Sequence, residues 1–310
     1  MKTKYSGKLV HRTVLFTAGH NKKYLEKTFS TNADAIVFDL EDAVPYNKKE
    51  EARNILKEFL SEKLPDNRPV YIRINPLHTG YTLLDLDATI CPNINGFLYP
   101  MTNSAQDIII FDAQLRLKEK QLNLPKEYFD IIAVIETPSG VLNIQEIATS
   151  SKRIVGLLFG SEDFLAEQEG NHGNESEGIN VPRHLISMAA KAANIMAIDT
   201  PFVNVGDFDG LKRHIEKGRN LGYNGMVVMS PRELPIISKL YTPNEQEVEH
   251  AKKIIRLSED AAKENRGIAI SDGIFVSPPT LKAANKTINR LNSIIEYEKF
   301  IYNHNLNNNG

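Results

Sequence analysis

The sequence predicts an α/β fold: a (β/α)8 barrel of the TIM type with a C-terminal helical extension. Short apolar runs recur eight times through the first three quarters of the 310 residues, and a helical stretch follows nearly every run. This alternation stops after Tyr241. Strands that alternate with helices pair in parallel, and eight such units close into a barrel rather than an open sheet. A doubly wound sheet is the alternative fold.

Each predicted strand is a short β-branched or apolar run that ends in polar or Gly residues. In chain order the strands are Thr13–Phe16, Ala35–Asp39, Val70–Ile74, Gly96–Tyr99, Ile131–Ile135, Gly156–Phe159, Ala197–Asp199 and Gly225–Met229. The segments between them have helical spacing and helix punctuation. The helices predicted are Asn21–Phe29, Lys48–Phe59, a short piece at Leu83–Ala88, Ala105–Glu119, Val141–Thr149, Pro182–Ala193, Asp207–Leu221 and Pro231–Leu240.

The C-terminal quarter has a different pattern and predicts a separate domain. We expect a barrel domain over residues 1–242 and a helical extension over residues 243–310. The extension is predicted to contain a long amphipathic helix Asn244–Asn265, a strand-like piece Gly267–Val276 and a last helix Thr280–Phe300.

Composition excludes several classes of partner. The net charge is -2 and the Lys and Arg residues are scattered, so the chain lacks the basic surface that nucleic acid requires. No run approaches the roughly 18 apolar residues that span a bilayer, and the N-terminus lacks the apolar segment of a signal peptide. We therefore expect a cytoplasmic protein without a membrane or nucleic-acid partner. The single cysteine, Cys91, excludes an intramolecular disulfide and is interpreted as structural.

Charged residues stand at the ends of several predicted strands, where barrels of this class place their active sites. They are Asp39, Glu41 and Asp42 after the second strand, Arg73 in the third, Glu136 after the fifth and Asp163 after the sixth. Carboxylates that converge on one mouth repel one another unless a cation neutralises them. A hard divalent ion is therefore expected, with Mg²⁺ first and Mn²⁺ second.

Each of these residues also has an ordinary structural explanation. A carboxylate that follows a strand is often a helix cap or a surface ion-pair partner, although their joint placement favours function. Arg73, in an apolar strand, needs anionic partners: either Asp39 or Glu41 pairs with it, or it binds a substrate carboxylate or developing oxyanion. Gly160 and Ser161 form a turn into a helix, whose amides can face a carboxylate.

His20 is the histidine placed at the predicted mouth, after the first strand. It is a candidate contact for a phosphate or thioester group, but a solvated loop histidine is the favoured interpretation.

Taken in order, these segments resemble the citrate lyase beta subunit-like family of the HpcH/HpaI aldolase/citrate lyase superfamily, from about Arg12 to Asn289. The matching segments are RTVLFTAGH, ADAIVFDLEDAV, VYIRIN, AVIETPSGVLN, LLFGSEDF, AIDTPF, LGYNG and DGIFVSPP. The resemblance implies a barrel whose C-terminal extension packs on a neighbouring subunit, in homo-oligomers that are usually trimers or hexamers. It also implies cleavage or formation of the carbon–carbon bond of 3-hydroxyacyl thioesters of the citryl-, malyl- or citramalyl-CoA type.

The same resemblance assigns catalytic and metal-binding roles. Glu136 and Asp163 match the direct Mg²⁺ ligands, and Glu41 and Asp42 match the acidic pair that holds metal-bound water. Arg73 matches the arginine that steadies an enolate or substrate oxygen, which fits the need to stabilise oxygen charge in retro-Claisen cleavage.

For the substrate, Phe16, Gly19 and the His20 loop match the segment that borders the thioester-carrying group. The role of Asp199, in a family-like segment, is less defined.

Four positions depart from the family pattern. Ser277 stands where many members have an aspartate that reaches a partner subunit's active site, and a serine hydroxyl needs an activating base to take a proton. Met226 and Ser230 replace a lysine and a histidine, and Met101 replaces another lysine.

Three functions therefore stay open. The first is a Mg²⁺-dependent lyase acting on a coenzyme A or carrier-protein thioester of a hydroxy acid. The second is a metal-dependent lyase or aldolase acting on a free keto or hydroxy acid. The third is a non-catalytic homologue that binds metal and keto acid.

Overall fold

The computed structural model describes residues 4–264, 267–271 and 273–302, and within them the chain forms two compact units. Lys4 and His11–Ser238 make up the first unit, and Tyr5–Val10 with the residues from Lys239 onward make up the second. The predicted end of a helix at Asn265 lies outside the described residues.

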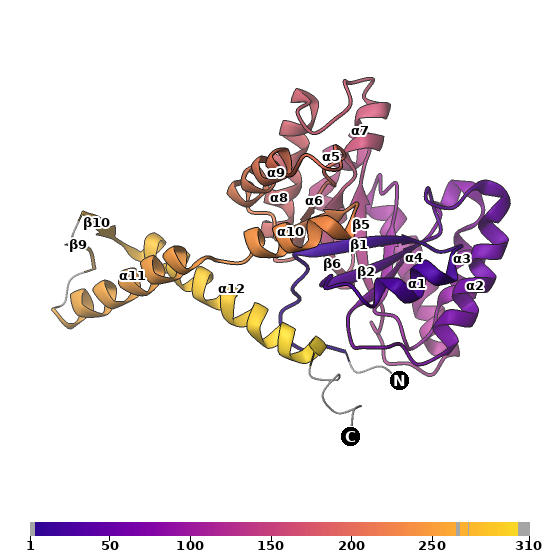
Figure 1. Ribbon diagram of the computed structural model, residues 1–310, viewed down its shortest axis with the longest axis horizontal. Helices are drawn as coiled ribbons and strands as arrows, with labels where there is room; N and C mark the ends of the chain where they lie inside the picture. The colour runs from indigo at the N-terminus through magenta and orange to yellow at the C-terminus, as the bar shows by residue number, and fades with distance from the viewer. Residues whose placement is uncertain (1–3, 265–266, 272, 303–310) are drawn as a thin grey trace. The chain divides into compact units, whose positions relative to one another are not determined.

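Eight parallel strands close into a barrel in the order β1 to β8, which confirms the predicted fold (Figure 1). β8 pairs with β1 and shuts the sheet, with Thr13 opposite Met226 and Leu15 opposite Val228. The strands are β1 Thr13–Ala18, β2 Ala35–Asp39, β3 Val70–Arg73, β4 Gly96–Tyr99, β5 Asp130–Ile135, β6 Ile154–Phe159, β7 Met196–Asp199 and β8 Gly225–Val228.

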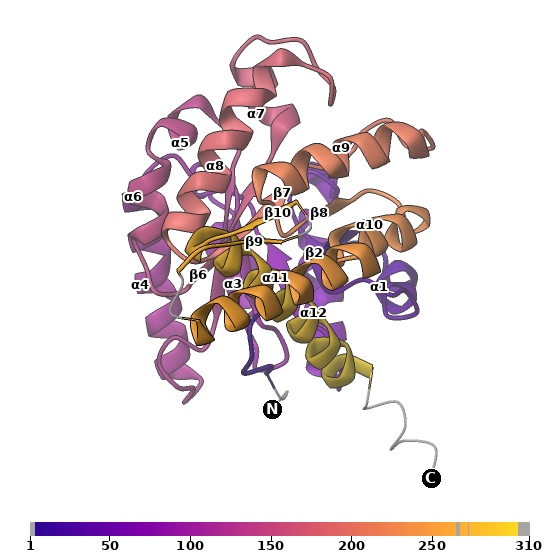
Figure 2. The same cartoon turned by 90° about the vertical axis from the view of Figure 1, so that its left-hand side faces the viewer.

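Helices follow the strands and surround them, as the view in Figure 2 shows. The α-helices of the barrel region are α1 Lys22–Thr28, α2 Lys49–Ser61, α3 Thr82–Thr89, α4 Ala105–Gln121, α5 Pro138–Leu142, α6 Ile144–Thr149, α7 Ser161–Glu167, α8 Asn180–Ala192, α9 Phe208–Leu221 and α10 Leu234–Tyr241. Short 3-10 turns precede α2, α3, α8 and α10: Tyr46–Lys48, Leu77–Thr79, Glu177–Ile179 and Pro231–Glu233.

The predicted helix Val141–Thr149 is two helices, α5 and α6, which meet at Asn143. The Asn143 side chain donates to the carbonyl of Asn103 (2.8 Å), so this residue ties the helix junction to the loop after β4. α5 also begins earlier than predicted, because Thr137 caps its first turn through the amide of Gly140 (2.9 Å) and Pro138 occupies its first position.

Buried arginines stabilise the amino-terminal ends of three strands. Arg12 pairs with Asp34 (2.8 Å) before β1, Arg68 pairs with Asp66 (2.6 Å) before β3, and Arg153 lies directly before β6. Arg153 forms ion pairs with two carboxylates of α4. Its guanidinium donates to Asp112 (2.7 Å) and to both carboxylate oxygens of Glu119 (2.6 and 2.7 Å), which fastens α4 to the start of β6.

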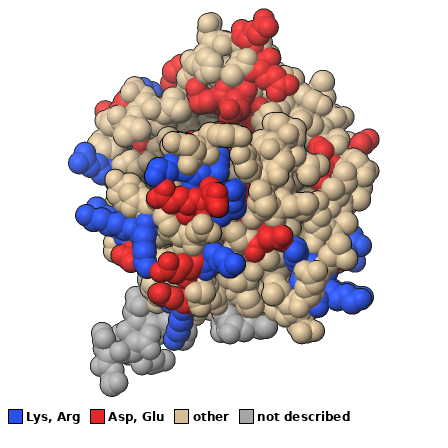
Figure 3. Space-filling model, turned by 90° about the vertical axis from the view of Figure 1, so that its right-hand side faces the viewer, with Lys and Arg blue, Asp and Glu red and all other residues tan. Residues whose placement is uncertain are grey.

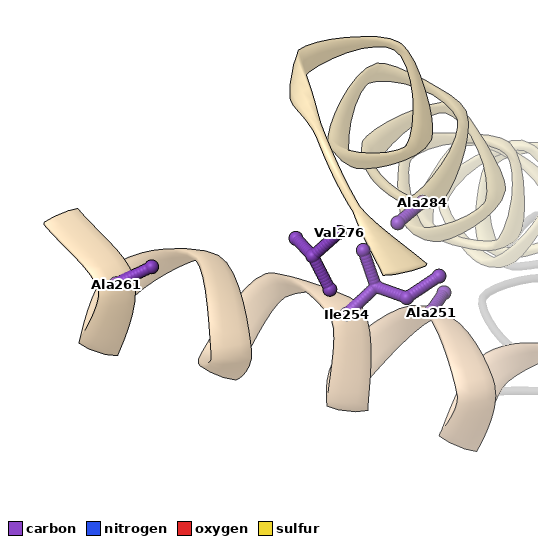
Figure 4. Close-up of a cluster of buried hydrophobic side chains, with 5 residues drawn as sticks. All are labelled: Ala251, Ile254, Ala261, Val276 and Ala284. Carbon is purple, nitrogen blue, oxygen red and sulfur yellow. The ribbon is translucent and has the colours of Figure 1, made fainter. Parts of the chain in front are cut away.

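The second unit is built from two long helices with a hairpin between them. The elements are α11 Glu245–Lys263, β9 Ala269–Ser271, β10 Ile274–Val276 and α12 Pro278–Tyr302. The predicted strand-like piece Gly267–Val276 is thus an antiparallel pair of strands. Small and β-branched residues form its core and let the helices approach closely (Figure 4): Ala251, Ile254, Ala261, Val276 and Ala284.

No helix in the described part of the chain has both the length and the apolar character that spanning a membrane requires.

We predict that Arg153→Met lowers the free energy of unfolding by about 3 to 5 kcal/mol, because the buried Glu119 loses its ion-pair partner and Asp112 loses the buried one of its two arginine partners. Arg116→Met is the matched control. Arg116 pairs with the same Asp112 (3.0 Å), but its side chain is exposed, so no measurable change is expected. Urea unfolding of the three proteins measures both effects, and equal losses in the two variants would contradict the assignment.

Candidate active site

Arg73 and Asp39 form the fixed centre of the site. They are the last residues of β3 and β2 and lie opposite each other in the sheet register. The Arg73 Nε and Nη2 donate to the two Asp39 oxygens (2.8 and 2.6 Å), a bidentate pair that fixes the plane of the guanidinium. Burial alone would raise the pKa of Asp39, but the Arg73 charge and hydrogen bonds lower it below its ordinary value.

The third guanidinium nitrogen of Arg73 faces the loop after β2. Its Nη1 lies 2.8 Å from Glu41 Oε2 and 3.2 Å from Asp42 Oδ2. Asp39 also shapes this loop, because its two oxygens accept the amides of Glu41 (2.8 Å) and Ala43 (3.0 Å). Arg73 thus forms ion pairs with both of the carboxylates predicted as its structural partners, Asp39 and Glu41. Its contact with substrate stays a prediction.

Glu136 follows β5 directly and is buried. Its Oε1 accepts the backbone N–H of Met101 (2.6 Å), and Met101 has a φ of 47°, in the left-handed region that a side chain of this size rarely adopts. A Cβ at Gly160 would lie 2.6 Å from Glu136 Oε2, so the carboxylate fits only beside a glycine. The surrounding backbone therefore sets the position of both oxygens.

Asp163 is an exposed residue in the first turn of α7, which begins immediately after β6. Burial is the main cause of the raised pKa of Glu136, and the charge of Asp163 adds to it, so the two predicted metal ligands lie within electrostatic reach of each other. Partial burial of its carboxyl group among the neighbouring acidic residues, followed by the charge of Asp42, raises the pKa of Asp163 itself, although the residue as a whole is exposed.

The acidic residues outnumber the cation that faces them. Burial raises the pKa of Glu136 to about 7 and that of Glu41 to about 9, even though Arg73 opposes both shifts. On the face drawn in Figure 3, acidic side chains lie directly against basic ones near the centre, and a second acidic group gathers at the top. An added divalent cation is the chemical group that such a carboxylate set fits.

The two predicted metal ligands, Glu136 and Asp163, would supply two carboxylates rather than a complete set of protein ligands. Within the described ranges, no group of three or more His, Cys, Asp or Glu side chains is arranged to hold a metal alone. This suits Mg²⁺, which proteins usually bind through one or two carboxylates while water and substrate supply the remaining ligands.

The remaining predicted barrel contacts lie around this centre. The Phe16 ring lies 5.2 Å from the Arg73 guanidinium carbon, a cation–π contact. The Gly19 amide donates to the Asp39 carbonyl (2.8 Å), and a Cβ there would lie 2.9 Å from that oxygen, so the glycine is needed for close packing. His20 is half-buried, and its Nδ1 has no hydrogen-bond partner among the described residues.

Ser161 begins α7, and its hydrogen bonds are made within the protein. Its amide donates to Thr200 Oγ1 (3.2 Å), and the two hydroxyl oxygens are 2.5 Å apart. The amide of Thr200 in turn donates to Asp199 Oδ1 (3.0 Å). Asp199 also accepts two hydrogen bonds from the buried Arg183. Asp199 therefore holds Thr200, which in turn contacts the first residue of α7.

The residues that depart from the family pattern have structural functions. Met226 is buried in β8, and the Ser230 hydroxyl accepts the amide of Arg232 (3.4 Å) at the start of the following turn. Ser277 belongs to the second unit, where its amide donates to Thr280 Oγ1 (2.7 Å) at the start of α12. Neither Met226 nor Ser230 supplies a cation, unlike the lysine and histidine of the family pattern.

Three groups beside the site were not predicted from the sequence: the backbone amide of Met101, the Thr200 hydroxyl, and the buried Lys49 ammonium, which donates to the carbonyls of Leu40 and Glu41. The left-handed turn at Met101 has no signal in its residue type, because methionine does not favour that conformation. Lys49 stands beside Lys48 in a charged helix start, where nothing in the sequence shows which lysine is buried.

Comparison with known proteins places the chain in a family. Residues 12–231 match the family model for HpcH/HpaI aldolase/citrate lyase. The chain belongs to this family. Among its relatives, the citrate lyase subunit beta of Haemophilus influenzae is 30% identical over 289 residues, covering 93% of this chain and 99% of the relative. The (3S)-malyl-CoA thioesterase of Cereibacter sphaeroides strain KD131 is 29% identical, covering 92% and 96%.

A solved structure agrees with this placement. CitE from Mycobacterium tuberculosis, in complex with magnesium, acetoacetate and coenzyme A, matches with a TM-score of 0.74 and 25% identity, covering 92% of this chain and 100% of that one. The predictions of a citrate lyase beta subunit-like chain and of a carbon–carbon lyase are confirmed at the level of the family.

We predict that the metal-free protein loses stability as pH rises from about 4.5 to 9. The pKa values of Glu136 and Glu41 are raised in the folded state, so the folded protein keeps protons that the unfolded chain has already released. Glu136→Gln should remove the part of this loss that Glu136 contributes between pH 4.5 and about 7, on the order of 3 kcal/mol. Urea unfolding in a chelating buffer across this range measures it, with the exposed Glu26→Gln as control. A Glu136→Gln slope equal to that of the wild type would refute the prediction.

Proposed function

We propose that the chain is a Mg²⁺-dependent lyase that cleaves a 3-hydroxyacyl thioester of the citryl-, malyl- or citramalyl-CoA type into a keto acid and an acyl thioester. One observation carries this proposal. Glu136 is a buried carboxylate whose oxygens are set by Met101 and Gly160, within electrostatic reach of Asp163. The relatives named for citrate lyase and malyl-CoA, and the CitE complex with magnesium and coenzyme A, support the substrate class.

Glu136 and Asp163 would hold the metal ion, which supplies Lewis-acid stabilisation of negative charge on the hydroxy or keto acid oxygen. In the cleavage, the hydroxyl loses its proton, the carbon–carbon bond breaks, and its electron pair moves into the thioester fragment as an enolate that then takes up a proton. Arg73 presents a fixed positive charge for the enolate oxygen, because Asp39 holds the guanidinium plane. Glu41 and Asp42 would hold ordered water beside Arg73.

A free hydroxy or keto acid is the alternative substrate. This alternative is favoured by the methionine at 226, buried in β8, and by Ser230, which caps its own turn, because neither offers a cation to the phosphates of a thioester carrier. The third possible function is a non-catalytic homologue that binds metal and keto acid. If this is correct, the wild type is inactive and Ser277→Asp creates activity.

Product analysis with and without coenzyme A separates these functions. We expect Mg²⁺-dependent release of a keto acid and an acyl thioester from one member of a panel of citryl-, malyl- and citramalyl-CoA. Glu136→Gln and Asp163→Asn should each lower kcat/KM at least about 100-fold, because each removes a metal ligand. Glu162→Gln, in the same turn as Asp163, is the control and should retain activity.

Turnover of the free acids alone would favour the alternative substrate. No turnover of either kind by the wild type, while Mg²⁺ still binds, would favour the non-catalytic homologue.

Gly160→Ala should weaken Mg²⁺ binding about 10- to 100-fold, because the added methyl group meets Glu136 Oε2 and displaces a ligand oxygen. Gly156→Ala, in the same strand region, is the matched control, since the closest atom to its Cβ is 3.4 Å away. Isothermal titration of Mg²⁺ into the three proteins measures the effect. Wild-type affinity in Gly160→Ala would show that Glu136 is not held as described.

A further inference from the structure

Lys49 is a buried lysine that forms no direct contact with any of the acidic groups near it. It is the first residue of α2, and its ammonium donates to the carbonyls of Leu40 and Glu41 and to Asn75 Oδ1, each at 2.7 Å. An ammonium has three donors, and here all three are used on one stretch of loop and one amide. Because each of its three N–H groups has an acceptor, the buried Lys49 side chain is held in one position.

The Asn75 side chain gives this contact a rigid support. Its Nδ2 donates to the Leu40 carbonyl (2.9 Å) and to Asp85 Oδ2 (2.6 Å), and Asp85 pairs with Arg53 (3.1 Å). The Leu40 carbonyl therefore accepts from both Lys49 and Asn75. This network joins α2, the loop after β3 and α3 to one point of the loop that follows β2, residues 40–45, which is called the acidic loop below.

The acidic loop is held on its other side by the site itself. The amide of Leu40 donates to the Arg73 carbonyl (2.9 Å), and the amide of Glu41 donates to Asp39 (2.8 Å). The peptide groups at 40 and 41 are thus fixed at their N–H ends by β2 and β3 and at their carbonyl ends by Lys49. The Glu41 side chain then reaches Arg73 at 2.8 Å.

Lys49 also places a positive charge beneath the acidic residues. Burial lowers its pKa, and the charges of Asp39, Asp85, Glu41 and Asp42 oppose that shift. The ammonium therefore offsets part of the repulsion among these carboxylates, although no ion pair between Lys49 and any of them is found among the described residues.

We propose that Lys49 is a positioning residue for the acidic loop: it holds the carbonyls of Leu40 and Glu41 so that Glu41 and Asp42 face Arg73 and the metal site. This inference rests on the proposed function, because the loop's task is to complete a Mg²⁺ site with Glu136 and Asp163.

Lys49→Met tests the proposal, with Lys48→Met as the matched control. Lys48 is the adjacent residue, is exposed and pairs with Glu51 (2.5 Å). We expect Lys49→Met to raise the Mg²⁺ dissociation constant about 10-fold by isothermal titration, an effect of the size seen for residues that orient metal ligands. Lys48→Met should match the wild type, and equal Mg²⁺ affinity in Lys49→Met would overturn the proposal.

Amide hydrogen exchange gives a second readout that does not depend on metal. The amides of Glu41 and Ala43 should exchange faster in Lys49→Met, whereas the amide of Ile36 in β2 should not. If the wild type binds no Mg²⁺, the proposed function fails, and this exchange pattern alone decides whether Lys49 holds the loop. Unchanged exchange at Glu41 and Ala43 would overturn the inference.

If Lys49→Met does not fold, Asn75→Ala removes one acceptor of Lys49 and one donor to Leu40. It should accelerate the same two amides, and an unchanged pattern would count against the proposal in the same way.

Discussion

The site depends on an imbalance of charge at the carboxyl ends of the barrel strands. Asp39, Glu41 and Asp42 contact the guanidinium of Arg73, two of whose three nitrogens bind Asp39, and Glu136 and Asp163 add further negative charge within reach of the same cation. The charge of Arg73 does not compensate for the burial of Glu41 and Glu136, so the pKa values of both carboxyl groups are raised. A protein keeps such a cluster where function requires it, because satisfied networks are otherwise more stable.

The rest of the barrel holds this imbalance in place. Asp39 forms an ion pair with Arg73, and its oxygens also accept hydrogen bonds from the amides of two loop residues. It therefore supports the site and is not expected to bind the metal ion. Met101 has a left-handed backbone conformation and donates its amide to the Glu136 carboxylate. Gly160 has no side chain and so leaves room for the same carboxylate. Backbone strain of this kind is characteristic of functional sites.

The sequence was sufficient to predict the architecture. Strand–helix alternation predicted the barrel that the structure confirms. The expectation that functional polar residues follow strand ends selected Glu136, Asp163 and Arg73, whose roles stay a prediction. The positions of the supporting groups could not be predicted, because they depend on the register between strands and on the path of loops. The pairing of Arg73 with Asp39 comes from adjacent strand ends, and the Met101 amide reaches Glu136 only through a turn that its residue type does not signal.

The structure also changes the meaning of some predicted contacts. Gly19 packs closely against the Asp39 carbonyl, and Ser161 uses its amide on Thr200, so both have structural explanations that periodicity alone could not supply. The helix break at Asn143 and the hairpin in the second unit likewise follow from local capping and pairing rather than from hydrophobic spacing.

We propose that a divalent ion binds between Glu136 and Asp163. Anomalous scattering from crystals soaked in Mn²⁺ locates such an ion directly. We predict one peak with carboxylate oxygens of both residues about 2.1 Å away. Absence of a peak there, or a peak bound to other residues at saturating Mn²⁺, would contradict the claim.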